Sequence, residues 1–238
     1  MTKQIIQRIL PQVQKPARYT GNEFNSVHKE VTKDMMTFAF CFPDVYEVGM
    51  SHLGIKILYH MLNERDDTSC ERVFAPWPDM EDLMRENGIP LLSMESHTPI
   101  AEFDMVGFTL QYEMSYSNVV NMLDMANIPL RTRDRKITDP FVCAGGPCAY
   151  NGEPIADFID FFILGEGEEV NNEIMDVYKN WKGSSDDRNT FLEEIAKIEG
   201  VYVPSFYDVF YNDDQTIKEI RPNRAGVPDM SSTIFSGI

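Results

Sequence analysis

The residues whose types and spacing could serve chemistry lie in four short segments, each after a predicted strand. The first segment, DVYEVGMSHLG, contains four residues of interest: Asp44, Tyr46, Gly49 and His52. The histidine could ligate a metal or exchange a proton, or it could cap or pack against the helix that follows. The glycine permits a sharp turn or a close approach of the backbone to a ligand.

The other three segments, GFTLQYEMSYSN, AGGPC and GEGEE, supply aromatic residues, paired glycines and acids. Aromatic side chains after a strand could pack on a planar ligand. Adjacent glycines let a ligand tail approach the backbone. The GEGEE segment presents N–H groups at a helix start, although its carboxylates would repel a phosphate. The candidate cofactor-binding residues of these segments are Thr109, Gly145, Gly146, Gly165, Glu166 and Gly167.

Familiar catalytic motifs are missing from the sequence. It contains no P-loop, no G-x-G-x-x-G fingerprint and no G-x-S-x-G elbow. Its four cysteines lack the spacing of a zinc site, and nothing suggests the secretion that disulfides accompany. An enzyme that uses His52 with Glu47 or Glu113 is a weaker hypothesis, because no nucleophile or metal set accompanies the histidine. The residues alone predict a ligand-binding domain whose ligand they do not specify.

The net charge of −17 disfavours two classes of partner, nucleic acids and anionic membranes. No apolar run reaches the roughly 18–20 residues that span a bilayer. The N-terminus lacks the apolar core of a signal peptide, so we expect a cytoplasmic protein. The first thirty-odd residues are mildly basic, which suits either simple solvation or an arm lying on an acidic body.

Strand and helix patterns alternate from residue 35 onwards. The apolar run 35–43 is typical of a strand buried on both faces of a parallel sheet. Further strands are expected within 70–77, 89–95, 101–111, 140–146 and 157–169, and helices within 55–67, 78–88, 115–129 and 170–182. This alternation predicts a doubly wound, mostly parallel α/β sheet of the flavodoxin-like type.

Three regions follow from these patterns. Residues 1–34 are expected to form a helix and an extended arm, residues 35–182 the α/β domain, and residues 183–238 a small α+β extension with a helix and a β-hairpin that turns at 212–214. In an open parallel sheet, ligands bind beyond the carboxyl ends of the strands. We therefore expect the four segments to converge at one crevice, with 44–54 as a loop.

The same residues carry a family resemblance. A strand followed by D-x-x-x-x-G, then VGFTL, AGGP and D-F-x-x-x-G-E-G-E, resembles the cobalamin-binding domain that precedes many radical S-adenosylmethionine (radical SAM) domains. KPARYTGNEFN, FPDVYEVGMSHLG, ERVFAPW, GFTLQYE and GVYVPSFY look like an uncharacterised radical SAM family, and the match covers about residues 15–207. The resemblance implies a cobalamin-binding-like fold, a corrinoid cofactor and a radical SAM catalytic domain as partner.

Two departures from the family pattern leave alternatives open. Tyr46 stands where the D-x-H-x-x-G motif of cobalamin-binding domains has its cobalt-ligating histidine, and a neutral phenol is a poor ligand. The C-x-x-x-C-x-x-C motif is absent, so an iron–sulfur cluster and S-adenosylmethionine are expected only through a further catalytic domain. The chain is therefore either a corrinoid-binding accessory domain or a scaffold and interaction module that kept the fold without the cofactor.

Overall fold

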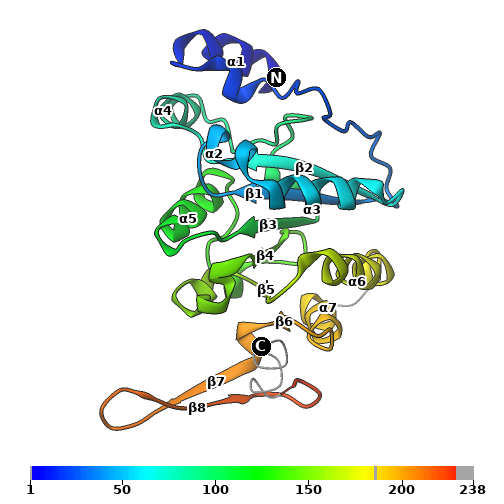
Figure 1. Ribbon diagram of the computed structural model, residues 1–238, viewed down its shortest axis with the longest axis vertical. Helices are drawn as coiled ribbons and strands as arrows, with labels where there is room; N and C mark the ends of the chain where they lie inside the picture. Colours follow the sequence, from blue (N-terminus) through cyan, green and yellow to red (C-terminus); the bar gives the residue numbers. More distant parts are fainter. Residues whose placement is uncertain (1, 185–186, 229–238) are drawn as a thin grey trace.

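A six-stranded sheet forms the centre of the computed structural model, which describes residues 2–184 and 187–228 (Figure 1). Its order is β2-β1-β3-β4-β5-β6, with β1–β5 parallel and β6 antiparallel to β5. The strands are β1 (Met36–Phe42), β2 (Thr68–Phe74), β3 (Met105–Thr109), β4 (Phe141–Gly145), β5 (Phe161–Ile163) and β6 (Val201–Tyr202). The order 2-1-3-4-5 is that of flavodoxin-like folds, which confirms the predicted doubly wound α/β class.

Helices cover both faces of this sheet (Figure 1). The helices are α1 (Thr2–Ile9), α2 (Tyr46–Ser51), α3 (Leu53–Glu64), α4 (Pro78–Glu86), α5 (Tyr116–Met125), α6 (Gly167–Trp181) and α7 (Arg188–Ile195). On one face α3 contacts α6, where Arg65 donates to Asp176. On the other face α4 contacts α5, where Arg85 donates to Asp124. Apolar strands between two helical layers explain why β1 and β2 are almost wholly buried.

Two predicted elements differ in the structure. The expected loop 44–54 is largely helical, because α2 and α3 follow one another with His52 alone between them. The expected strand 89–95 is wrong. Leu91 N–H donates to Met125 O of α5, so this part turns away from the sheet. Next to β2, Met94 N–H of this segment donates to Arg72 O. The Arg72 N–H donates to the side-chain carboxylate of Glu95 and not to a backbone carbonyl, so no strand ladder forms there.

The N-terminal arm lies along the β2 edge of the body. Lys29 Nζ donates to the carbonyls of Arg65 and Thr68. Lys15 and Arg18 form ion pairs with Glu47 of α2, and these pairs lower the pKa of Glu47 to about 2, with the Arg18 hydrogen bond as the main cause. Of the two interpretations of the basic arm, these contacts favour the one in which the arm lies on the acidic body.

The C-terminal region contributes to the sheet and then leaves it. After α7, strand β6 pairs with β5, and the hairpin β7 (Tyr207–Tyr211) with β8 (Ile217–Pro222) extends from the body (Figure 1). The predicted hairpin and its turn near 212–214 are confirmed, since Asn212 N–H donates to Thr216 O. Residues 229–238, for which the sequence shows no period, lie outside the described residues.

No helix in the described residues is long and apolar enough to cross a membrane.

The interior of the domain contains charged side chains. The Asp160 carboxylate, which is 5% exposed, accepts from Arg135 Nη1 at 2.8 Å, Arg188 Nη2 at 3.1 Å and Val142 N–H at 2.7 Å. Burial lowers the pKa of Arg135, and Asp160 opposes that effect. One carboxylate therefore joins the start of β5 to β4 and to two guanidinium groups.

Replacing this carboxylate should be costly. We expect Asp160→Ala to lower the free energy of unfolding in urea by about 3–5 kcal/mol, because it leaves buried guanidinium charge without its partner. The matched control is Asp157→Ala three residues earlier, whose carboxylate pairs with Arg131 on the surface. Its loss should cost about 0.2–1 kcal/mol. Equal effects of the two variants would contradict a special role for Asp160.

Candidate functional site

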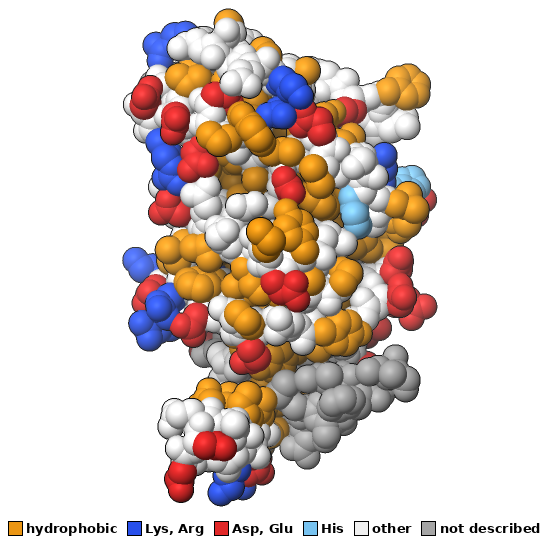
Figure 2. Space-filling model, turned by 60° about the vertical axis from the view of Figure 1, so that its left-hand side comes forward, with side chains coloured by type: hydrophobic (Ala, Val, Ile, Leu, Met, Phe, Trp, Pro, Cys, Tyr) orange, Lys and Arg blue, Asp and Glu red, His pale blue; other side chains and the backbone are white. Residues whose placement is uncertain are grey.

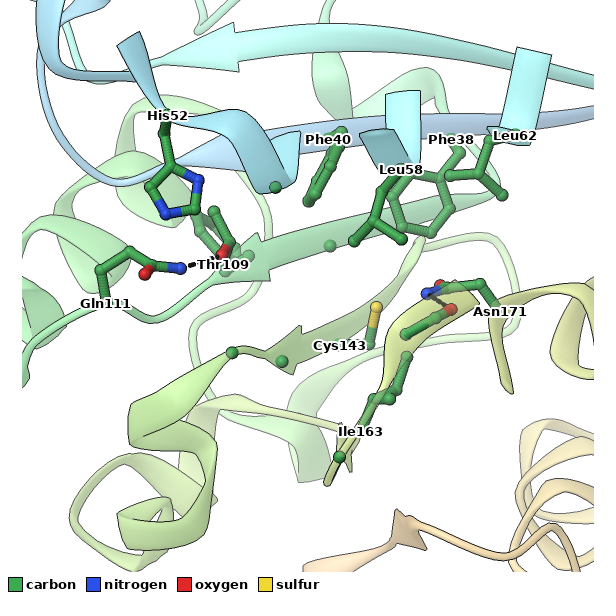
Figure 3. Close-up of a pocket in the computed structure, with 17 residues that line it drawn as sticks. Phe38, Phe40, His52, Leu58, Leu62, Thr109, Gln111, Cys143, Ile163 and Asn171 are labelled. Carbon is green, nitrogen blue, oxygen red and sulfur yellow. Dashed lines mark hydrogen bonds between the residues drawn. The ribbon is translucent and has the colours of Figure 1, made fainter. Parts of the chain in front are cut away.

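A cavity of about 160 Å³ opens at the carboxyl edge of the sheet, between the sheet and helices α3 and α6 (Figure 3). It lies over β1, β3, β4 and β5. Its lining residues are Phe38, Phe40, His52, Gly54, Leu58, Leu62, Gly107, Phe108, Thr109, Gln111, Cys143, Gly145, Gly146, Ile163, Gly165, Gly167 and Asn171. Ligands of open α/β sheets bind at this edge.

Glycines allow the walls of the cavity to pack closely against one another. A Cβ on Gly107, in the middle of β3, would lie 2.4 Å from the ring of Phe38 and 3.2 Å from the Cys143 sulfur. A Cβ on Gly167, the first residue of α6, would lie 3.4 Å from Leu58 of α3. The sheet floor and the helix start therefore both depend on the absence of a side chain.

The mouth of the cavity is polar. Gln111 Nε2 donates to Thr109 Oγ1 at 2.7 Å, and Thr109 is 8% exposed. The His52 ring points from the junction of α2 and α3 toward these two residues (Figure 3). Its Nδ1 is the one buried side-chain nitrogen or oxygen in the described residues that has no hydrogen-bond partner. Such an atom in a native fold calls for an explanation.

The inner part of the cavity is apolar. Figure 3 shows Phe38, Leu58 and Leu62 around its inner end, opposite the mouth. Asn171 is the polar residue there, and its Nδ2 donates to Gly167 O at 2.6 Å. Cys143 contributes a sulfur, and burial raises the pKa of its thiol, so the group is neutral near pH 7. The arrangement suits a flat apolar group inside with polar atoms at the mouth.

Six of the ten sequence-predicted site residues line this cavity: His52, Thr109, Gly145, Gly146, Gly165 and Gly167. Three of the others lie elsewhere for clear reasons. Asp44 accepts a hydrogen bond from Tyr112 OH at 2.7 Å beyond the lining. Gly49 packs against the ring of Phe74, and Glu166 is an exposed residue at the start of α6.

Tyr46, the tenth residue, lies on the side of α2 that faces the N-terminal arm. Its ring is 5.4 Å from that of Phe74 in a T-shaped arrangement. Burial, together with a hydrogen bond to Glu23, raises the pKa of Tyr46 to about 12. The phenol is therefore neutral and is used in packing the arm on the body. It does not line the cavity.

Sequence reasoning missed several lining residues. Gln111 follows the selected Thr109 by two positions, which is the strand period, and that signal was available. Asn171 lies one helical turn after Gly167, on the same face of α6. Cys143 and Ile163 had no distinguishing signal, because an apolar residue of a buried strand gives no indication of which face borders a cavity.

Exposed apolar side chains lie at the carboxyl edge of the sheet, outside the cavity lining. The space-filling view shows hydrophobic side chains gathered over the carboxyl edge of the sheet (Figure 2). They come from α2, α3 and the segments after β3 and β4: Val48, Leu53, Tyr112, Met114 and Tyr150, which are 40–85% exposed. Clustered apolar surface of this kind marks binding sites.

The cysteines give a chemical test of this geometry. Burial raises the pKa of all four thiols, but Cys41, Cys70 and Cys143 are buried whereas Cys148 is partly exposed. Since the thiolate is the reactive form, we expect iodoacetamide to label Cys148 alone in the native protein, faster at pH 9 than at pH 7. Mass spectrometry should find no native labelling in Cys148→Ser and labelling of all remaining cysteines in urea. Fast labelling of Cys143 in the native protein would contradict its burial in the sheet floor of the cavity.

Comparison with known proteins places the chain. A family model described as radical SAM proteins, N-terminal, matches residues 54–204, more than half of the chain. The uncharacterized protein MJ0966 of Methanocaldococcus jannaschii is 25% identical over 200 residues, which cover 83% of this chain and 34% of that protein, so the chain spans about a third of the length of this curated relative. No solved structure matches. With its cavity at the carboxyl edge of a flavodoxin-like sheet, the chain belongs to the family of N-terminal regions of radical SAM proteins.

Proposed function

We propose that this domain binds a corrinoid at the carboxyl edge of its sheet and presents it to a radical SAM catalytic domain. In this proposal the cavity receives the aromatic base at the end of the corrinoid's nucleotide tail, and the macrocycle lies outside over the apolar rim. The observation that carries the proposal is the cavity itself, an apolar space between α3, α6 and a glycine-containing sheet floor, open at the ligand-binding edge.

The size of the cavity supports this division of the ligand. An apolar cavity of about 150 Å³ takes one benzene ring, so about 160 Å³ suits a small aromatic group and is far too small for a corrin macrocycle. Along α3 the lining runs from Gly54 to Leu62, which corresponds to about 12 Å at the helical rise. A flat two-ring base fits that length, with the mouth left for its ribose and phosphate.

The rim supports the place of the macrocycle. Leu53, in the segment that follows β1, is 68% exposed, and Met114, in the segment that follows β3, is 85% exposed. Covering such side chains with a large, partly apolar ring removes their surface from water. The remaining face of the macrocycle would then be open to a second domain.

Family membership supports an accessory role for this chain. Radical SAM chemistry needs an iron–sulfur cluster and S-adenosylmethionine, and in this proposal the catalytic domain holds both. The described residues contain no group of three or more histidine, cysteine or acidic side chains that could hold a metal ion, and three of the four cysteines are buried. What this chain's own residues do is bind and orient the corrinoid and exclude water from its tail.

A titration of the purified chain with hydroxocobalamin, followed by the corrin visible spectrum, tests the proposal. We expect saturable binding that Leu58→Trp weakens at least about tenfold, a change of about 1.4 kcal/mol, because the indole fills the cavity. The matched control is Ile57→Trp, the preceding residue of α3, which is 42% exposed and outside the cavity. Cobinamide, which lacks the nucleotide tail, should bind about as weakly to both variants as to the unchanged chain.

Leu58 is a better position for this test than Gly146. Gly146 has φ +95°, and a Cβ there would lie 2.9 Å from Leu110 O, so a bulky residue would disturb the backbone as well as fill the space. Absence of cobalamin binding up to about 1 mM, where the binding free energy is about 4 kcal/mol, would favour the scaffold hypothesis.

A further inference from the structure

Resting on the proposed function, we propose that His52 holds the corrinoid tail as a hydrogen-bond donor at the cavity mouth and does not ligate cobalt. The cobalt would then receive no nitrogen ligand from the described residues of this chain. His52 is a positioning residue in this arrangement, with Thr109 as the second donor.

The two nitrogens of the His52 ring have different surroundings. Nδ1 is buried without a partner, and it would lie 3.3 Å from a Cβ placed on Gly54, in the first turn of α3. Nε2 forms no hydrogen bond with the described residues and is not among their buried unpartnered atoms. The ring points into the mouth of the cavity (Figure 3). The accessible nitrogen is therefore Nε2.

The helix start decides which nitrogen carries the proton in the neutral ring. His52 occupies the position before α3, a helix of 12 residues, and its side chain forms no capping hydrogen bond. The first turn of a helix carries unpaired N–H groups and partial positive charge. A lone pair on Nδ1 suits that partial positive charge, whereas an N–H there would be a buried donor without an acceptor. The proton consequently lies on Nε2, which becomes a donor facing the cavity.

Cobalt ligation would require the opposite arrangement. A ligating Nε2 needs its lone pair, which moves the proton to the buried Nδ1. Histidines that bind metals almost always donate their other N–H to a carboxylate, a carbonyl or water, and Nδ1 of His52 has no such partner. Tyr46, at the position of the family's ligating histidine, packs against Phe74 beside the N-terminal arm, and its hydroxyl is hydrogen-bonded to Glu23. Neither residue is therefore arranged as an axial ligand.

The chemistry at the mouth fits the polar part of the tail. Thr109 Oγ1 accepts from Gln111 Nε2, so its hydroxyl hydrogen is available for another acceptor. His52, between α2 and α3, and Thr109, at the end of β3, both line the cavity. The ribose and phosphate that join a corrin ring to its base are rich in acceptor oxygens. Two donors at this place suit them.

Electron paramagnetic resonance of cob(II)alamin bound to the ¹⁵N-labelled chain tests the absence of a ligating nitrogen. We expect a bound spectrum without nitrogen superhyperfine splitting. A doublet from ¹⁵N would come from a protein imidazole, and its loss in His52→Ala would overturn this inference while the proposed function stands. A triplet from ¹⁴N would come from the cofactor's own base and would place that base outside the cavity. Failure to bind would instead contradict the proposed function.

The affinity of the variants tests the donor role. His52→Ala should weaken cobalamin binding about fivefold, the effect of one neutral hydrogen bond, and should leave cobinamide binding unchanged. His52→Gln keeps an N–H donor and should recover most of that loss. The matched control is His60→Ala, in the helix that follows His52 but exposed and paired with Glu64, which should bind like the unchanged chain. Equal losses in the alanine and glutamine variants would overturn the donor role.

Discussion

The reversal of strand order at β1 is the constraint on which the candidate site depends. The chain enters the sheet at β1, passes through α3 to β2 on one side, and builds β3, β4 and β5 on the other. Helices α3 and α6 therefore lie on the same face, and both begin at the carboxyl edge. Their first turns cannot both cover β1 and β3, so a space remains between them. The glycine in β3 lines that space, and the loops after four strands reach its mouth.

The helical conformation of residues 46–51 decides which side chains take part. In α2, Tyr46 and Met50 lie one turn apart on one face, and Arg72 donates to the Met50 sulfur on that face. Arg72 also pairs with Glu95 and with Glu23 of the arm. Tyr46 therefore belongs to the junction between arm and body. His52, the single residue between α2 and α3, points toward the cavity instead. The residue at the histidine position of the D-x-H-x-x-G motif, Tyr46, is therefore not the residue that lines the cavity.

The sequence predicted the architecture well because buried parallel strands and amphipathic helices differ in period. It also identified six cavity residues, since strand ends and glycine pairs mark the ligand edge of such a sheet. It failed for 89–95, where an apolar run has strand composition but Leu91 bonds to α5. It also failed for 44–54, where Gly49 indicated a loop. That glycine is required for packing under Phe74 and Phe42, inside a helix. Local patterns cannot distinguish these uses of a glycine.

The cost of the cavity bears on the choice between a ligand-binding domain and a scaffold. An enclosed apolar void destabilises a fold by about 24 cal/mol per Å³, which for a void of 160 Å³ is of order 4 kcal/mol, and less here because the mouth is open. A module selected only for its fold would gain stability if side chains filled that space. A ligand that inserts an aromatic group recovers the same free energy on binding. The unfilled space is therefore better explained by a ligand than by a scaffold.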